Sequence, residues 1–235
     1  MRDYIILNGT SSQTIPGLLI QNLPPISKPR QRVEIEEIDG RDGDIVTYLG
    51  YGAYDKEFKI GLFGSYDVDE IISYFNSEGT VIFSNEEDKY YNYQIIEQID
   101  FDKLLRYKEA TVKMHVQPFK YSAEDNQKVF SVDSTTTSIS IRNSGNIYSR
   151  PVLTITGSGS IDLYLNDIQL FVINMESYTS ITIDTNNMNA YNGNTLLNRN
   201  VTGSYDNFKL NIGNNTISWS GAITQIEIDN YSRWI

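Results

Sequence analysis

The chain has 235 residues, of which 40% are hydrophobic, and a formal net charge of −11 at pH 7. The absence of cysteine excludes a disulfide scaffold, a Cys-ligated zinc site and a thiol nucleophile. An acidic surface repels nucleic acid, because binding to phosphates depends on Lys and Arg. The apolar runs are shorter than the roughly 18 residues of a membrane-spanning helix, and the first residues lack the apolar core of a signal peptide. We therefore expect a protein made in a cytoplasm.

The first predicted elements form a long hairpin between Val33 and Gly64. Two runs of β-type composition flank the turn Gly40-Arg-Asp-Gly43, and an aromatic, glycine-rich loop follows. We expect this hairpin to lie at a sheet edge and to serve assembly rather than catalysis. Aromatic residues are favoured in interface cores, so the predicted oligomer contacts are Tyr48, Tyr51 and Tyr54.

The same hairpin carries a cluster of acidic residues. Residues 1–122 contain 20 acidic and 13 basic residues, a net charge of −7. Like charges repel unless they are solvated, so we expect these carboxylates on a wet surface or lining a pore. Their spacing does not fit an EF-hand calcium loop. The candidates for a pore or channel wall are Glu36, Glu37, Asp39, Asp42 and Asp44.

One short helix is predicted over about residues 67–77. Asp67 is a good N-cap residue, and Gly79 is expected to end the helix. The apolar stripe with helical spacing comprises Val68, Ile71, Ile72 and Phe75.

A half-buried strand is predicted from Glu109 to Gln117, with Val112, Met114 and Val116 inward and His115 outward. His115 is the only histidine, and it has no recognisable catalytic partner in the sequence. We therefore predict no catalytic residue, no metal ligand and no cofactor.

Charge and proline content fall after residue 122, and a small, polar segment follows. The predicted organisation is a domain over 1–125, a linker over 126–136 and a second domain over 137–235. Short strands with Asn- and Gly-rich turns indicate a β-sandwich in the second domain. Asn166-Asp167 is predicted to form a two-residue hairpin turn, and Trp219 to face inward.

An asparagine-rich segment from Asp184 to Gly203 is a candidate sugar site or an ordinary sandwich loop. Amide side chains with an aromatic ring suit sugar recognition, but asparagine is also a common turn residue. The candidate sugar contacts are Asn189, Tyr191, Asn194 and Arg199.

The order of these features resembles the distal tail proteins of long-tailed phages that infect Gram-positive bacteria. In the front half the resemblance rests on Gly40 to Gly43, the helix at 67–77, Glu78 to Asn85, Tyr90-Tyr91 and Pro118 to Tyr121. In the back half it rests on Asn143 to Asn146, Ser149 to Pro151, Ile155 to Gly157, Gly213 to Asn215 and Arg233-Trp234.

The resemblance implies a mainly β fold. Its front domain would be a tail-tube-like β-barrel or sandwich with one short helix, and its back domain a galectin-like or carbohydrate-module-like β-sandwich. It also implies a structural virion protein of the tail tip, without enzyme activity, that forms a homo-hexameric ring. The ring would join the tail-tube protein to a tail-associated lysin or a baseplate or fibre protein, and DNA would pass through its channel without specific binding.

Two other functions stay open at this point. One is a carbohydrate-binding adhesin of the baseplate. The other is a glycoside hydrolase, which needs two carboxylates about 5–10 Å apart across a cleft. A tail-tube subunit would not need the second sandwich.

Overall fold

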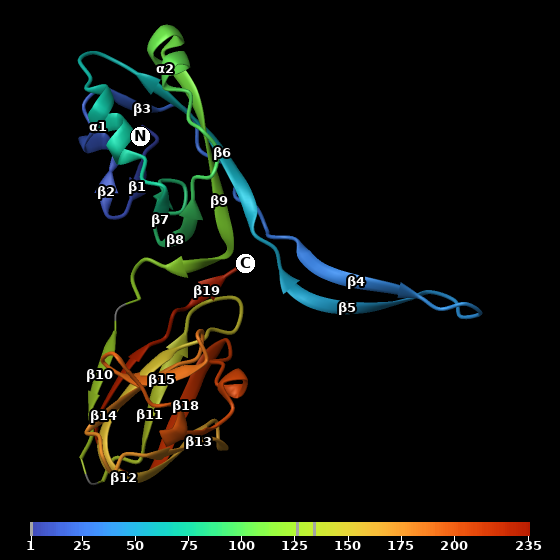
Figure 1. Ribbon diagram of the computed structural model, residues 1–235, viewed down its shortest axis with the longest axis vertical. Helices are drawn as coiled ribbons and strands as arrows, with labels where there is room; N and C mark the ends of the chain where they lie inside the picture. The colour runs from blue at the N-terminus through green and yellow to red at the C-terminus, as the bar shows by residue number, and fades with distance from the viewer. Residues whose placement is uncertain (1, 126, 134) are drawn as a thin grey trace. The chain divides into compact units, whose positions relative to one another are not determined.

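The computed structural model describes residues 2–125, 127–133 and 135–235. The predicted mainly β fold class is confirmed (Figure 1). The chain divides into two compact units, unit 1 up to Ala123 and unit 2 from Glu124 to Trp234. None of the described helices has the length and apolar character needed to cross a membrane.

Unit 1 is built around one antiparallel sheet with strand order β2-β1-β7-β8-β9-β6-β3. The strands of unit 1, inside and outside this sheet, are β1 (Ile5–Leu7), β2 (Thr10–Ser11), β3 (Leu18–Ile20), β4 (Gln31–Glu37), β5 (Asp44–Tyr51), β6 (Tyr54–Leu62), β7 (Glu78–Phe83), β8 (Lys89–Gln94) and β9 (Glu109–Ser122). Its helices are η1 (Ser12–Thr14), α1 (Val68–Tyr74) and α2 (Phe101–Tyr107). The predicted alternation in β9 is confirmed, because Val112, Met114 and Val116 are fully buried in the core and Thr111 is exposed.

Helix α1 begins as predicted and ends earlier. The Asp67 carboxylate accepts hydrogen bonds from the backbone N–H groups of Asp69 and Glu70. The helix stops at Tyr74, so the predictions that it reaches residue 77 and ends at Gly79 are wrong. Gly79 lies in β7, where pairing with β8 already starts at Glu78 and draws the chain into the sheet.

A second helix, α2, was not predicted. Asp100 caps it by accepting a hydrogen bond of 2.8 Å from the Lys103 backbone N–H, and Lys108 ends it in the left-handed conformation. The helix has only seven residues, and its apolar repeat is limited to Phe101, Leu104 and Leu105, of which Leu104 is buried, so the signal is too short to stand out in the sequence.

Strands β4 and β5 form a two-stranded sheet of their own, so the predicted position at the edge of a larger sheet is wrong. We call residues 31–51 the arm; it stands apart from the sheet of unit 1 (Figure 1). All residues from 31 to 50 are exposed. The predicted aromatic loop is also wrong: Tyr48 and Tyr51 lie in β5 and Tyr54 in β6, because only Gly52 and Ala53 separate these strands.

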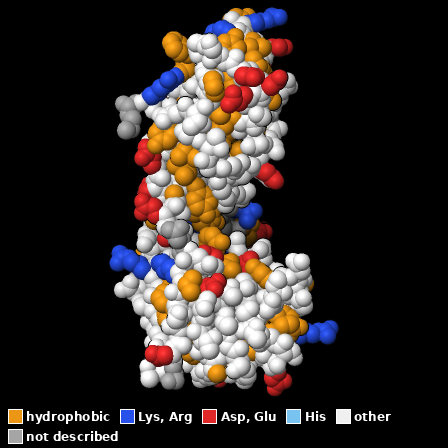
Figure 2. Space-filling view, turned by 90° about the vertical axis from the view of Figure 1, so that its left-hand side faces the viewer, with side chains coloured by type: hydrophobic (Ala, Val, Ile, Leu, Met, Phe, Trp, Pro, Cys, Tyr) orange, Lys and Arg blue, Asp and Glu red, His pale blue; other side chains and the backbone are white. Residues whose placement is uncertain are grey.

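Unit 2 consists of β strands and single-turn helices. Its strands are β10 (Lys128–Ser131), β11 (Ser138–Asn143), β12 (Val152–Leu165), β13 (Ile168–Asn174), β14 (Ser180–Asp184), β15 (Asn189–Asn192), β16 (Thr195–Leu196), β17 (Val201–Gly203), β18 (Gly213–Asp229) and β19 (Arg233–Trp234). The single-turn helices are η2 (Asn198–Asn200) and η3 (Tyr205–Asn207). Figure 2 shows that charged side chains are sparse on the visible face of this unit.

The two longest strands, β12 and β18, pair with each other and shift register near Gly157 and Gly221. Each of the two strands therefore has a different outer neighbour at each end of the pair. At one end β11 pairs with β18 and β13 with β12, and at the other end β10 pairs with β18 and β14 with β12. Side chains from both ends share one core, in which Trp219 is buried, as predicted. The predicted turn at Asn166-Asp167 is confirmed by positive φ angles of 49° and 67°. Strand β10 lies within the predicted linker, yet it pairs with β18 as part of this unit.

Candidate functional site

The arm has two chemically different faces. Residues directly opposite each other on paired strands share a face. Val33 lies opposite Tyr48 and Ile35 opposite Val46, and all four are exposed. The other face carries Glu34 opposite Thr47 and Glu36 opposite Ile45. We call Val33, Ile35, Val46 and Tyr48 the apolar stripe.

The apolar stripe needs a physical explanation. A two-stranded ribbon is marginally stable in water by itself, and contiguous apolar side chains on a soluble surface usually mark an interaction site. Tyr48 is 69% exposed and Ile35 58%. The stripe is therefore the strongest candidate for a binding surface on the arm.

The acidic candidates are divided among three positions on the arm. Glu36 lies on the face opposite the stripe, and Glu37 and Asp44 end the stripe as cross-strand partners. Asp39 and Asp42 lie in the turn. Like charges placed directly opposite each other on a sheet are unfavourable unless water or a cation solvates them. Among the described residues, no group of three or more His, Cys, Asp or Glu side chains is arranged to hold a metal ion.

The three predicted interface tyrosines have different environments. Tyr48 is on the exposed stripe, whereas Tyr51 and Tyr54 lie at the base of the arm and are half-buried. The Tyr51 ring packs edge-on against Phe119, with 5.6 Å between ring centroids. The Tyr54 hydroxyl donates to the Ser27 carbonyl at 3.3 Å. Within the chain, two of the three therefore hold the base of the arm.

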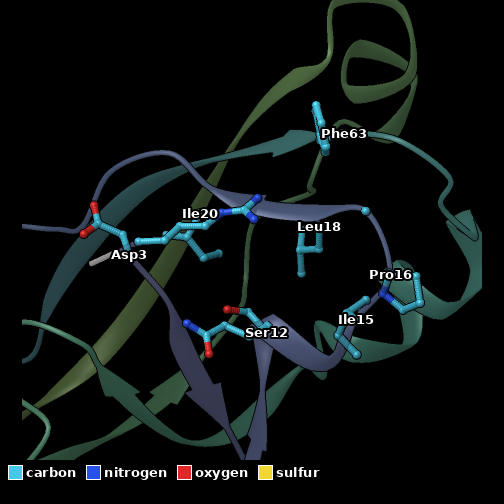
Figure 3. A pocket seen from close by; sticks show the side chains of 10 residues that line it. Asp3, Ser12, Ile15, Pro16, Leu18, Ile20 and Phe63 are labelled. Carbon is cyan, nitrogen blue, oxygen red and sulfur yellow. The ribbon is translucent and has the colours of Figure 1, made fainter.

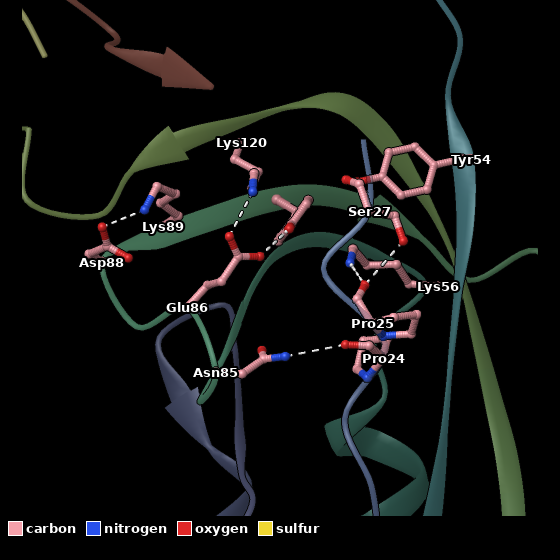
Figure 4. Close-up of polar contacts among 11 residues, drawn as sticks. Pro24, Pro25, Ser27, Tyr54, Lys56, Asn85, Glu86, Asp88, Lys89 and Lys120 are labelled. Carbon is pink, nitrogen blue, oxygen red and sulfur yellow. Dashed lines mark hydrogen bonds and ion pairs between the residues drawn. The ribbon is translucent and has the colours of Figure 1, made fainter. Parts of the chain in front are cut away.

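The sequence analysis missed a set of buried charged residues in unit 1, close to Tyr54 at the base of the arm (Figure 4). Lys56 is 3% exposed and Lys120 is 7% exposed. Lys120 Nζ lies 2.7 Å from Glu86 Oε1, and the Tyr91 hydroxyl donates to Glu86 Oε2 at 2.6 Å. Burial, then the hydrogen bond to Glu86, raises the pKa of Tyr91. The alternation of Lys56 with Phe58 was the signal that could have found this inward lysine.

His115 lies on the outward face of β9, as predicted, beside Asp55 of β6. The His115 Nδ1 and Asp55 Oδ1 atoms are 2.8 Å apart, and Lys113 Nζ lies 3.2 Å from the other carboxylate oxygen. Hydrogen bonds from His115 and then Lys113 lower the pKa of Asp55. Lys113 also pairs with Glu97 at 2.6 Å, so these groups form an ion network on the sheet surface.

The four candidate sugar contacts lie on neighbouring elements of unit 2. Asn189 and Tyr191 are half-buried in β15, and Ala190 between them points into the core. Asn194 is exposed in the turn before β16, and Arg199 is exposed in η2. The sugar site stays a prediction.

Both units have cavities that could admit a ligand. In unit 1, cavities of about 370 and 330 Å³ lie beside Glu78 and Glu70. Another, of about 310 Å³, lies between η1, β3 and Phe63 (Figure 3). Asp3 is its one carboxylate among the described lining residues. The cavity in unit 2 measures about 430 Å³, lies between the β12–β13 turn and η3, and is lined by none of the four candidate sugar residues.

No protein-family model matches this sequence, and no curated protein does. Among solved structures, the chain is similar to the Dit protein (gp 19.1) of SPP1, described as a paradigm of the hub adsorption apparatus in phages infecting Gram-positive bacteria. The TM-score is 0.64 at 14% identity, and the match covers 97% of this chain and 99% of that chain. Two structures of the phage P2 baseplate in its activated conformation, with Ca and with Sr, give TM-scores of 0.49 and 0.43. Their identities are 13% and 14%, with coverage of 97% and 96% of this chain and 97% of each of theirs. The resemblance to a distal tail hub protein is thus confirmed at the level of the fold.

Proposed function

We propose that this chain is a structural subunit of a phage tail hub, and that its copies close into a ring at the distal end of the tail. The observation that carries the proposal is the fold likeness to the SPP1 hub protein over 97% of this chain and 99% of that one. A match of this extent spans both units. The proposal therefore concerns the whole chain and not a single shared domain.

The arm supplies a contact suited to a ring. Its apolar stripe is a sheet face that the described residues of the chain leave exposed, and a second copy of the chain would cover it. When one surface of a subunit binds a different surface of the next, identical contacts close into a ring if the rotation allows it. The proposed assembly is a homo-hexamer in which Tyr48 lies in the contact and Tyr51 and Tyr54 hold the arm base against which the neighbour packs.

The acidic residues of the arm belong on a wet wall or rim of this ring. Several copies multiply the charge of Glu36, Glu37, Asp39, Asp42 and Asp44 around one axis, so these groups are favourable only where water solvates them. An acidic wall releases no counterions from DNA, and DNA would slide along it without being held. The proposed neighbours along the tail are the tail-tube protein on one side and a tail-associated lysin or baseplate or fibre protein on the other.

The geometry gives less support to a glycoside hydrolase. Its two carboxylates must face each other across a cleft. The acidic residues of the arm lie on an exposed two-stranded ribbon. The described linings of three cavities in unit 1 each contain a single carboxylate, namely Asp3, Glu78 or Glu70.

The ring is tested by measuring the mass of the full chain across concentrations with light scattering. We expect a closed oligomer, and we expect the double variant Ile35→Ser/Tyr48→Ser to need at least about 10-fold more protein to assemble, because interface cores carry most of the binding energy. Ile45→Ser is the control, since Ile45 lies in β5 like Tyr48 but on the opposite face of the arm. A monomer at tens of micromolar would overturn the ring, and a monomer that also binds cell-wall sugar would favour the adhesin.

A further inference from the structure

The segment that enters the arm is held by side chains rather than by a backbone ladder. Residues 23–29 make no backbone–backbone hydrogen bond to other described residues. Pro24, Pro25 and Pro29 have no N–H group to offer. Without other support, this segment would leave the direction of the arm poorly defined.

Three side chains from the body of unit 1 bind its carbonyl groups instead (Figure 4). Asn85 Nδ2 donates to the Pro24 carbonyl at 3.2 Å, and Lys56 Nζ donates to the Pro25 carbonyl at 2.9 Å. The Tyr54 hydroxyl donates to the Ser27 carbonyl at 3.3 Å. We call Tyr54, Lys56 and Asn85 the root clamp. Their donors reach successive points of the segment just before β4.

Lys56 is the central member of the root clamp. Its ammonium lies 4.8, 5.6 and 5.7 Å from the ring centroids of Tyr91, Phe83 and Tyr54. Such ring faces attract a cation, but they leave its hydrogen-bonding needs unmet. The Pro25 carbonyl meets this need, and a buried ammonium that lost this bond would pay a desolvation penalty.

The charged neighbours of Lys56 are already engaged with one another. Glu86, from the turn between β7 and β8, is paired with Lys120 of β9 and accepts from the Tyr91 hydroxyl. The Pro25 carbonyl is consequently the hydrogen-bond acceptor that holds Lys56 in place among the described residues. The same hydrogen bond also holds Pro25 against the sheet of unit 1.

We propose that Lys56 is a positioning residue for the arm: its ammonium binds the Pro25 carbonyl and thereby sets the direction in which the arm leaves unit 1. The backbone hydrogen bond of 2.9 Å from the Gly52 N–H to the Arg30 carbonyl keeps the two strands together at the base. The root clamp then orients this joined base relative to the sheet. The consequence for assembly rests on the proposed ring function, whereas the direction of the arm is a property of the single chain.

A fixed direction matters because an interface element that is already oriented loses less conformational entropy on binding. Without the Lys56 ammonium, the bonds from Asn85 and Tyr54 remain, and the arm would sample a wider range of directions. Ring formation would then require a higher protein concentration even though the apolar stripe is unchanged.

The test uses the absence of cysteine, which allows two spin labels to be placed without background. Thr47 on the arm and Ser73 on α1 are exposed positions of unit 1 and are replaced by cysteine. Dipolar spectroscopy on the full chain at low concentration then measures the distribution of distances between the labels. We compare the wild-type background with Lys56→Met, which keeps an apolar side chain under the rings and removes the donor.

We expect Lys56→Met to widen the distribution at least about 2-fold and to shift ring formation to higher concentration. Lys59→Met is the matched control on the outward face of the same strand, where Lys59 pairs with Glu109, and it should leave the width unchanged. An unchanged width in a folded Lys56→Met chain overturns the proposal. If that variant does not fold, Lys56→Leu decides instead, because it also removes the donor to the Pro25 carbonyl, and an unchanged width there overturns the proposal as well. A wider distribution in a chain that never forms rings would leave the positioning role intact and refute the proposed function.

Discussion

Glu86 and Lys120 form an ion pair inside unit 1, with 2.7 Å between Oε1 and Nζ and 9% of each side chain exposed. The second carboxylate oxygen of Glu86 accepts the Tyr91 hydroxyl at 2.6 Å. The pair joins the turn after β7 to β9, next to Lys56. A buried pair of this kind contributes little compared with an apolar pair of similar volume, but it becomes costly when one partner is removed.

Glu86→Gln should therefore destabilise unit 1 by about 3–5 kcal/mol, because it leaves Lys120 buried without its counter-charge. The measurement is hydrogen exchange of the β9 amides in the full chain. Glu109→Gln breaks the exposed pair with Lys59 and serves as the control, with an expected cost of about 0–1 kcal/mol. Equal effects of the two substitutions would contradict the prediction.

The stability of unit 1 should depend on pH through Lys56. Burial lowers the pKa of Lys56 from 10.5 to about 8, with Glu86 opposing the shift and Lys120 adding to it. The unfolded chain therefore binds more protons than the folded chain between those two values, and Lys56 makes stability rise with pH across that window. Below a pH of about 8, Lys56 is protonated in both states, and the cost of burying its ammonium lowers the free energy of unfolding by its full amount.

The free energy of unfolding of Lys56→Met provides the reference for this pH effect. Between pH 7 and pH 10 we expect the wild type to gain on the order of 1–3 kcal/mol relative to Lys56→Met. Hydrogen exchange or denaturant unfolding at both pH values measures the difference. A difference that is constant, or that moves in favour of the variant, would show that Lys56 titrates normally.

Gly79→Ala should destabilise unit 1 more than a glycine substitution at an open position. Gly79 has a φ of +146°, and an added Cβ would overlap the Asn8 side chain. Asn8 cannot move away freely, because its Oδ1 accepts the Thr80 N–H at 2.8 Å and its Nδ2 donates to the Glu78 carbonyl at 3.3 Å. We expect a cost of about 2–4 kcal/mol.

The control is Gly64→Ala, at a φ of +67° with no atom within 4 Å of the added Cβ. It should cost about 1 kcal/mol, the strain of the left-handed conformation alone. The double variant Asn8→Ala/Gly79→Ala should cost less than the sum of the single changes, since it removes the overlap. Strict additivity would contradict the explanation.

Strand β10 should decide whether unit 2 folds well alone. Lys128 to Ser131 pair with Ile228 to Gln225 of β18, so a fragment that starts at residue 132 exposes that edge. We expect the fragment 124–235 to be soluble and the fragment 132–235 to be less stable by about 1–3 kcal/mol. Emission from Trp219, measured with Trp234→Phe in both fragments, reports the folded core. Equal stability would support the predicted linker instead.

Local features of this chain followed from the sequence because their causes lie within a few residues. The alternation of Val112, Met114 and Val116 places them on one face of a strand, whatever that strand packs against. The Asp67 cap needs only the next three residues, and the turn at Asn166-Asp167 needs only two residues that tolerate positive φ. The order of such features along the chain was enough to indicate the fold.

The tertiary structure alone decided which neighbours these elements acquire. Gly79 became part of a strand because β8 and Asn8 hold it there. The arm became a separate ribbon because, among the described strands, β4 and β5 pair only with each other. Lys56 and Lys120 are charged residues, for which an exposed position is the ordinary expectation. They are buried because Glu86, the aromatic rings and the Pro25 carbonyl converge on them from segments up to 95 positions apart, from Pro25 to Lys120. Local pattern specifies a face and a turn, whereas partners so distant along the chain meet only after the sheet has formed.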